Sequence, residues 1–465
     1  MAGIPTVVVT RSGFEGIVSN AFAGFGFNSE YSKGYVFPSD MFLQGSDLSP
    51  IEEHFKEFIE GGLLTWEPEM KEKGVIAPDL ITVNAKTYEA AFENVNNMFS
   101  RNMWRDSLPI MPPTEEKVEW ILKGVPQGMT ADDVIGNILP RGGVATVRSL
   151  AVALVMAGGR PEYLPTLIAC MQAVVHPNMN MQSWGATTNS CFPVFIVDGP
   201  MARDIRLASG YGLAGPNPQY PAGGVIGRAV RLILTAIGGQ TPGIGTMAIY
   251  GGSRSENLVF AEDFEDLPEG WTSVAEEFGF KRDQDVVTIT VCNSLVNVLW
   301  DFGNIEGNEH GLNAMAGCMA APNAVKLDGP VAASLADDPH YMQGLVLLPK
   351  GYVKSLQSVS GMSKADVQEY LWEKSKTTYE YNVDCGYEAF MKRRGLYGPG
   401  DMVPAAPKPE QILMATCGGS QSGHGYWLAP ISSGLNTAIE IKKPAGWDDL
   451  MLDAEIAIGP IPATN

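Results

Sequence analysis

The pattern of apolar and polar positions predicts a chain that mixes helices and strands along its whole length. Short runs of β-branched and apolar residues favour strands over 5–10, 192–197, 286–292, 345–348 and 412–416. Apolar residues at helical spacing predict helices that begin at 49 and that cover about 86–99, 114–124, 130–139, 144–156, 162–175, 224–237 and 363–376. Because both kinds of element occur throughout, we expect an α/β fold in which helices pack on strands.

A cluster of prolines divides this pattern into two parts. Pro109, Pro112 and Pro113 stand within five residues, and such a run excludes a helix at this point. We therefore expect a small α/β domain over 1–105 and a larger, mixed and helix-rich α/β domain over 106–465.

Charge and hydropathy exclude several classes of partner. The net charge of -20, with 32 basic against 52 acidic residues, argues against nucleic acid and anionic membrane surfaces. The apolar stretches 144–159 and 164–175 are shorter than the ~20 residues of a membrane span, and no secretory signal opens the chain. Six cysteines without a CxxC pair fit reduced thiols. These features predict a cytoplasmic protein, and its size and apolar helices favour an oligomer.

A glycine-rich loop near the carboxyl end is the sharpest candidate for chemistry. It runs from Cys417 through Gly418, Gly419 and Ser420 to His424, directly after an expected strand. Successive glycine N–H groups can form a concave site for an anion, and a nearby imidazolium can convert a thiol to a nucleophilic thiolate. The alternative is a tight turn in which Cys417 is a small buried residue. The loop does not lead into a helix, so it is neither a phosphate-binding nor a dinucleotide-binding motif.

Two further segments gather polar groups that a ligand could pair. Thr187, Thr188 and Asn189 precede an expected strand, and they fit either a substrate pocket or a capping loop. Asn217 lies in a loop before the apolar helix over 224–237.

That apolar helix carries two arginines on one face. Arg228 and Arg231 are three residues apart, and each needs an acidic partner or a bound anion beside it. The acidic residues considered as partners are Glu256, Glu262 and Asp263.

A metal site has little material in this sequence. The chain holds five histidines, and no H-x-x-x-H or H-E-x-x-H pattern occurs. Glu309 and His310 could act as a general base or as ligands, or they could belong to a solvated loop. The cofactor stays unknown, with a metal possible and no nicotinamide or flavin motif.

The opening segment Gly3-Ile-Pro-Thr-Val-Val-Val-Thr10, followed by Phe14, resembles the UGSC family of bacterial proteins with a cysteine or selenocysteine motif, grouped with glycine-reductase-type selenoproteins. The rest of the chain resembles a large bacterial family found joined to that domain. The matching segments are 106–118, 156–165, 186–188, 197–200, 226–228 and 418–419.

The thiol motif of the resembled family is absent here. In that family the reactive residue lies before the Gly-x-Pro-Thr strand, whereas this chain begins at Met1-Ala2-Gly3 and its first cysteine is Cys170. The resemblance therefore implies either a separate partner subunit that carries the motif or a domain that has lost it.

Together these features predict a subunit of a bacterial enzyme that acts on a small anionic or amide-bearing organic molecule, by hydrolase or lyase chemistry. Cys417 or His424 would be the nucleophile or base. Binding groups would be Thr187, Thr188, Asn189, Asn217, Arg228, Gly418, Gly419 and Ser420. The alternatives are a non-catalytic scaffold subunit of a hetero-oligomer and a reductive thiol-dependent or metal-dependent enzyme.

Overall fold

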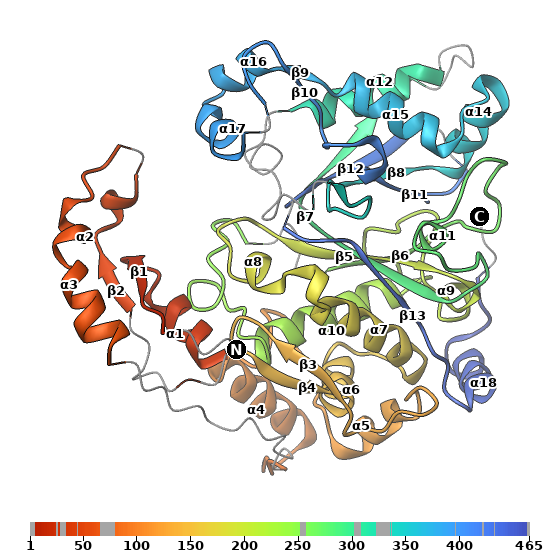
Figure 1. The fold of residues 1–465 in the computed structure, drawn as a ribbon. Helices are drawn as coiled ribbons and strands as arrows, with labels where there is room; N and C mark the ends of the chain where they lie inside the picture. The colour runs from red at the N-terminus through yellow and green to blue at the C-terminus, as the bar shows by residue number, and fades with distance from the viewer. Residues whose placement is uncertain are drawn as a thin grey trace.

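The fold of this chain was obtained as a computed structural model. The structure describes residues 5–24, 27, 34–43, 45–65, 80–251, 257–301, 308–321, 335, 337–395, 397–420, 423–431 and 433–462. It confirms a mixed α/β fold, with one central sheet between layers of helices (Figure 1).

The central sheet has seven strands. They are β5 (Phe192–Asp198), β6 (Leu258–Ala261), β7 (Val286–Leu299), β8 (Leu345–Leu348), β11 (Leu413–Thr416), β12 (His424–Pro430) and β13 (Thr437–Glu440). Six of them follow the order β11-β8-β12-β7-β5-β6, and β13 pairs with the first part of β7. The pairs β11/β8 and β5/β6 are parallel, and the others are antiparallel.

The sheet curls so that its two edge strands meet at their carboxyl ends. The N–H of Asp263, just after β6, donates to the carbonyl of Thr416 at the end of β11, at 2.8 Å. The inner surface of this curl is a separate apolar core, in which every strand from β5 to β12 of the main path contributes side chains. Its fully buried members include Phe192, Phe260, Leu345 and Leu428.

Helices cover the outer face of the curled sheet on two sides. On one side lie α6 (Val147–Met156), α7 (Leu164–Val175) and α10 (Ala222–Ala236), and on the other lie α12 (Asn308–Ala320), α14 (Lys350–Ser360) and α15 (Lys364–Lys374) (Figure 1). Helix α7 is buried nearly all round, as its continuous apolar sequence requires. The two helical layers form two further apolar cores with the sheet between them.

A smaller N-terminal unit stands beside the main body (Figure 1). It contains the parallel strands β1 (Val8–Arg11) and β2 (Gly34–Phe37), with the helical segments α1 (Glu15–Gly24), η2 (Ser39–Phe42), α2 (Ser49–Glu53), α3 (Phe55–Glu57) and η3 (Phe58–Leu63). Helix α4 (Tyr88–Arg101), which falls within 1–105, packs against the main core through Phe99. Asn96 of α4 also exchanges two hydrogen bonds with the backbone of Ile110, at 2.9 and 3.2 Å.

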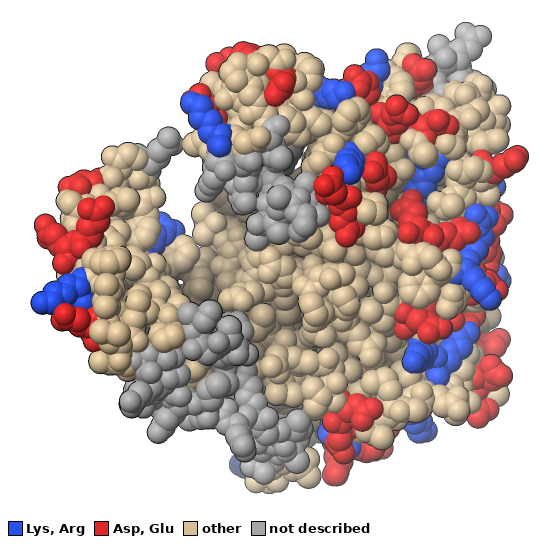
Figure 2. Space-filling model, in the orientation of Figure 1, with Lys and Arg blue, Asp and Glu red and all other residues tan. Residues whose placement is uncertain are grey.

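The remaining elements surround this framework. They are α5 (Glu115–Leu122), β3 (Val134–Ile138), β4 (Gly143–Thr146), η4 (Pro161–Tyr163), η5 (Pro177–Met179), α8 (Met181–Gly185), α9 (Pro200–Asp204), α11 (Val274–Glu277), β9 (Thr377–Thr378), α16 (Tyr379–Asp384), α17 (Glu388–Arg394), β10 (Met402–Val403), η8 (Pro409–Gln411) and α18 (Trp447–Ile458). In the space-filling view, charged side chains gather along the rim of the main body, and its centre is largely uncharged (Figure 2).

One predicted helix is wrong, and a second begins later than predicted. The segment 130–139 forms β3, because the Thr130 hydroxyl donates to Asp133 at 2.7 Å and closes a turn, after which β-branched residues pair with β4. The segment from 144 begins as β4, and α6 starts only at Val147, where Thr146 and Ser149 form a reciprocal cap.

Other boundaries agree closely with the sequence. Strand β8 covers the predicted residues, and the first residues of two predicted helices, Thr114 and Ser363, are the N-caps of α5 and α15. Each of the six cysteines is a free thiol. Within the described ranges, no helix has both the length and the apolar character that crossing a bilayer requires.

Candidate functional site

The glycine-rich turn near the carboxyl end lines a cavity of about 600 Å³. Cys417, Gly418 and His424 face it from one side, and the loop Tyr211–Gly215 faces it from the other. The two sides are joined by a 2.6 Å hydrogen bond from the Gly418 N–H to the Ser209 carbonyl. Gly418 and Gly419 have φ values of 105° and 84°, which side-chain-bearing residues rarely adopt.

The environment of Cys417 opposes a thiolate nucleophile. The residue is buried, and burial, followed by the nearby Glu262 and Asp263 carboxylates, raises its pKa well above the ordinary value of a thiol. The exposed His424 lies on the same cavity with its Nδ1 3.4 Å from Asn297 Oδ1, and no hydrogen bond joins it to Cys417 in the described part of the chain. The geometry therefore favours the alternative in which Cys417 is a small buried residue.

A second cavity, of about 190 Å³, shares Gly210 and Tyr211 with the first. Asp263 lines it, and the Ser209 hydroxyl donates to Asp263 Oδ1 at 2.8 Å. The other oxygen, Oδ2, is buried and has no hydrogen-bond partner among the described residues. Burial raises the pKa of Asp263 above its usual value, against the opposing effects of Ser209 and Lys350.

Lys350 brings a positive charge to this second cavity. It is the first residue of α14 and lines the cavity beside Asp263, with its Nζ 2.9 Å from Asp266 Oδ2. Hydrogen bonding to Asp266 is the main cause that raises the pKa of Lys350, so its ammonium group stays protonated. A cation and an unpaired carboxyl group thus face the same small space.

Glu262, the neighbour of Asp263 in the sequence, forms a buried pair of carboxyl groups with Asp198. Glu262 accepts hydrogen bonds from the backbone N–H groups of Thr416, at 2.8 Å, and Val274, at 2.7 Å. These bonds join the ends of β6 and β11 to the start of α11. Glu262 thereby holds the curled sheet closed at the point where the cavity opens.

The partner of Glu262 is Asp198, the last residue of β5. Both oxygens of Asp198 are buried, and the nearby Ala275 N–H lowers its pKa only slightly. Burial, and next the charge of Glu262, raises the pKa of Asp198 well above its usual value. Two neighbouring carboxyl groups can hydrogen-bond only if one of them is protonated, so the raised pKa of Asp198 favours a proton on Asp198 that it shares with Glu262.

The other predicted binding residues are divided between separate places. Asn217 shapes the Tyr211 loop, since its Nδ2 donates to the Tyr211 carbonyl at 3.0 Å and its Oδ1 accepts two backbone N–H groups. Thr187 accepts from the Asn189 N–H at 3.1 Å, and Asn189 lines a different cavity, of about 390 Å³. Exposed Ser420 packs its carbonyl against Gly351 at the start of α14, and the Thr188 carbonyl accepts from Ile249 at 3.1 Å.

Arg228 is held by an acid that the sequence reasoning did not consider. Its Nε and Nη2 donate to the two oxygens of Asp106 at 2.9 and 3.0 Å, and Nη2 also donates to the Pro109 carbonyl at 2.8 Å. Glu262 and Asp263 are therefore wrong as its partners, and Glu256 lies outside the described residues. This guanidinium fastens the proline segment to α10, a structural role that leaves it little capacity to bind a substrate.

The sequence held a signal for the residues that were missed. Asp198 ends the buried strand β5, Glu262 follows the buried strand β6 directly, and Asp263 comes next. A carboxylate at the carboxyl end of a buried strand is placed where α/β sheets commonly bind ligands. What the sequence could not show is that the curl of the sheet brings these positions to Cys417.

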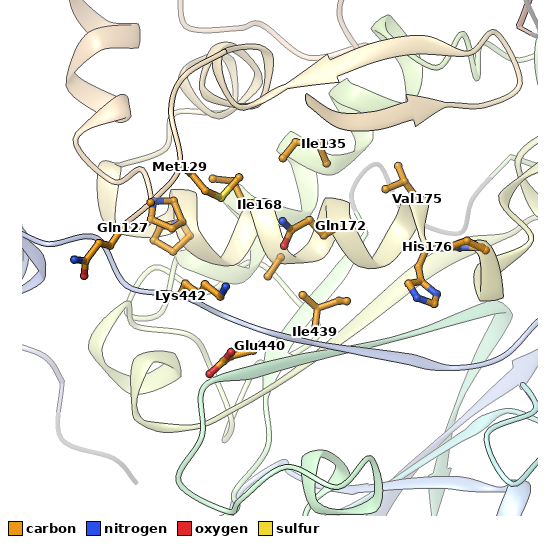
Figure 3. Close-up of a pocket in the computed structure, with 15 residues that line it drawn as sticks. Gln127, Met129, Ile135, Ile168, Gln172, Val175, His176, Ile439, Glu440 and Lys442 are labelled. Atoms are coloured by element: carbon orange, nitrogen blue, oxygen red, sulfur yellow. The ribbon is translucent and has the colours of Figure 1, made fainter. Parts of the chain in front are cut away.

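A fourth hollow, of about 690 Å³, lies between α7 and the end of β13 with the segment that follows it (Figure 3). Gln172 points into it from α7, and Glu440 and Lys442 lie opposite, among mostly apolar neighbours (Figure 3). None of the predicted site residues lies there.

The described residues contain no group of three or more His, Cys, Asp or Glu side chains placed to hold a metal ion. Glu309 accepts a hydrogen bond from the Tyr370 hydroxyl at 3.3 Å at the start of α12.

No protein-family model, curated protein or solved structure matches this chain.

Proposed function

We propose that this chain is an enzyme that uses Asp263 as a general acid–base on a small amide-bearing organic molecule. The observation that carries the proposal is the Asp263 carboxyl group, which lines a cavity beside Lys350 and whose buried Oδ2 has no hydrogen-bond partner among the described residues. A buried carboxyl group on a cavity wall, with a pKa above its usual value, is typical of acid–base catalysts.

The neighbours of Asp263 support distinct roles in such a reaction. The hydroxyl of Ser209 holds Oδ1, so that Oδ2 is left to take a proton from water or give one to a leaving group. The ammonium group of Lys350 would stabilise negative charge that develops on a carbonyl oxygen. This division of labour fits hydrolase or lyase chemistry.

The charge of the cavity favours a neutral amide over an anion. Its lining includes the acidic side chains of Glu262, Asp263, Glu265 and Asp266, against the basic ones of Arg203 and Lys350. A fully anionic substrate would meet repulsion there, whereas an amide could hydrogen-bond to both kinds of group. The cavity of Cys417 and His424, which adjoins at Tyr211, offers room for the rest of the molecule.

The test compares wild type with Asp263→Asn on a panel of small carboxamides, nitrogen-containing lyase substrates and a metabolite extract, followed by mass spectrometry. We expect one class of compound to be consumed by wild type and its turnover to fall roughly 10²- to 10⁴-fold in Asp263→Asn. The matched control is Asp132→Asn, because the side chain of Asp132 is 85% exposed. Equal turnover by Asp263→Asn and wild type would refute the proposal.

A partner-binding role for the N-terminal unit is a second candidate. This unit leaves several large apolar side chains exposed, among them Leu43, Phe55 and Leu64. Such groups favour an interface, either with the partner subunit implied by the UGSC resemblance or with a second copy. Light scattering of the purified chain, alone and after co-purification from its host, distinguishes a hetero-oligomer from a homo-oligomer and from a monomer, and a monomer under both conditions would contradict this role.

A further inference from the structure

We infer that the cavity of about 390 Å³ beside α10 is a binding site for a small oxyanion, a carboxylate or a phosphate, separate from the Asp263 cavity. Side chains from α4, α8 and α10 and from the loops around them line it. Those used in the argument are Arg105, Asn189, Cys191, Arg231, Thr235 and Gln240.

Arg231 supplies the first reason. It follows Arg228 by three residues on α10, yet within the described residues its hydrogen-bond partner is the neutral Asn257, whose Oδ1 accepts from Nη2 at 2.9 Å. Burial lowers the pKa of Arg231, because the surrounding protein solvates its charge poorly. A guanidinium in such a place requires a counter-ion, and among the described residues no carboxylate supplies one.

Arg105 adds a second positive charge on the same cavity. Its Nε donates to the Asn96 carbonyl at 3.2 Å and its Nη1 to the Leu108 carbonyl at 2.8 Å, both of which are uncharged. The one carboxylate on the lining, Asp106, already forms a two-pronged pair with Arg228. A positive cavity is thus built into a chain whose net charge is -20.

Neutral polar groups complete the lining. Thr235 lies one turn beyond Arg231 on α10, and Asn189 and Gln240 offer amide groups from two loops. Cys191 is also present, and burial raises its pKa to about 12, so that it contributes an uncharged thiol. This composition explains why the loop from Thr187 to Cys191 gathers polar residues: it forms part of the wall of an anion site.

The volume and the cations indicate the class of ligand. A cavity of about 390 Å³ lies within the range of small-molecule sites. A guanidinium matches the planar fork of a carboxylate or two oxygens of a phosphate. The occupant is therefore a small organic acid, a phosphate ester or inorganic phosphate.

The test is calorimetric titration of the full chain with sodium succinate and, separately, with inorganic phosphate at constant ionic strength. We expect saturable binding of at least one of them, with affinity reduced roughly 10- to 100-fold in Arg231→Met. Succinate binding alone identifies a carboxylate site and phosphate binding alone a phosphate site. The matched control is Arg148→Met, because Arg148 pairs with Glu119 away from the cavity. If neither anion binds, or if Arg231→Met binds as wild type does, the inference is overturned.

A second readout uses the wild-type chain and does not depend on a variant that folds. The bound anion should slow alkylation of Cys191 by N-ethylmaleimide at least twofold, and the exposed Cys385 should react at an unchanged rate. Unchanged labelling of Cys191 at saturating anion would contradict the site. Asp263→Asn should bind the anion as wild type does, so failure of the proposed catalysis and failure of this site are distinguishable.

Discussion

Asp198→Asn should make the protein more stable at neutral pH, although it alters a fully buried polar group. The structure indicates that Asp198 keeps a proton which it shares with Glu262. Asparagine has the same shape and donates an N–H in place of that shared proton. The variant therefore keeps the hydrogen bond to Glu262 and no longer needs to take up a proton on folding.

The magnitude follows from proton linkage. The pKa of Asp198 is raised in the folded state, so the folded protein binds one more proton than the unfolded chain above the ordinary Asp pKa of ~3.9. Wild-type stability consequently falls by about 1.4 kcal/mol for each pH unit until the pH passes the raised pKa. Asp198→Asn lacks this loss, so the difference between variant and wild type should grow by about 1.4 kcal/mol for each pH unit between the ordinary pKa and the raised one.

The assay is urea unfolding of both proteins, measured at half-unit pH intervals from about 4.5 to about 7.5. Other carboxyl groups with raised pKa values, such as Asp263 and Asp285, contribute equally to both proteins and cancel in the difference. Glu262→Gln is the matched comparison. Glutamine has one acceptor oxygen for the two N–H groups that Glu262 binds, so this variant should lose about 1–3 kcal/mol.

A destabilised Asp198→Asn protein, or a stability difference that does not change with pH, would refute the shared proton. Gain of stability in both variants would show that Glu262 does not hold the edges of the sheet together.

Two further predictions follow from the same contacts. Arg228→Met should cost about 3–5 kcal/mol of unfolding free energy in urea titrations, because it leaves the largely buried Asp106 carboxylate unpaired, and Arg228→Met combined with Asp106→Leu should recover most of that loss. If the single and double variants are equally unstable, the contacts of Arg228 with carbonyl groups, rather than the ion pair, hold the segment. Cys417 should react with iodoacetamide far more slowly than exposed Cys385 at pH 8, as peptide mass spectrometry measures, because burial raises its pKa; a hyper-reactive Cys417 would restore the thiolate mechanism.

Local patterns in the sequence predicted much of the fold because the forces that they reflect are local. The caps at Thr114 and Ser363 and the apolar run that forms β8 depend on neighbours within a few residues. The segment 130–139 was predicted as a helix because its apolar residues fit the spacing of a helix as well as that of a strand. The turn between Thr130 and Asp133 favours the strand.

The candidate site was only partly predictable, because the residues that form it lie far apart along the chain. The glycine turn at Cys417 could be singled out as a candidate because its composition is local information, and it does line a cavity. The meeting of Asp198, Glu262 and Thr416 depends on the curl of a sheet, which brings Glu262 to Thr416 across 154 residues of sequence. The partner of Arg228 was missed for the same reason, because Asp106 lies 122 residues away.

The most direct test of the central claim is the pH dependence of kcat/KM for the substrate found in the panel, measured for wild type and Asp263→Asn. Asp263 serves as base when deprotonated, so the wild-type rate should rise with pH through an apparent pKa above the ordinary range of a carboxyl group. That rise should vanish in Asp263→Asn. A variant that keeps the wild-type profile would contradict the assignment of acid–base chemistry to Asp263.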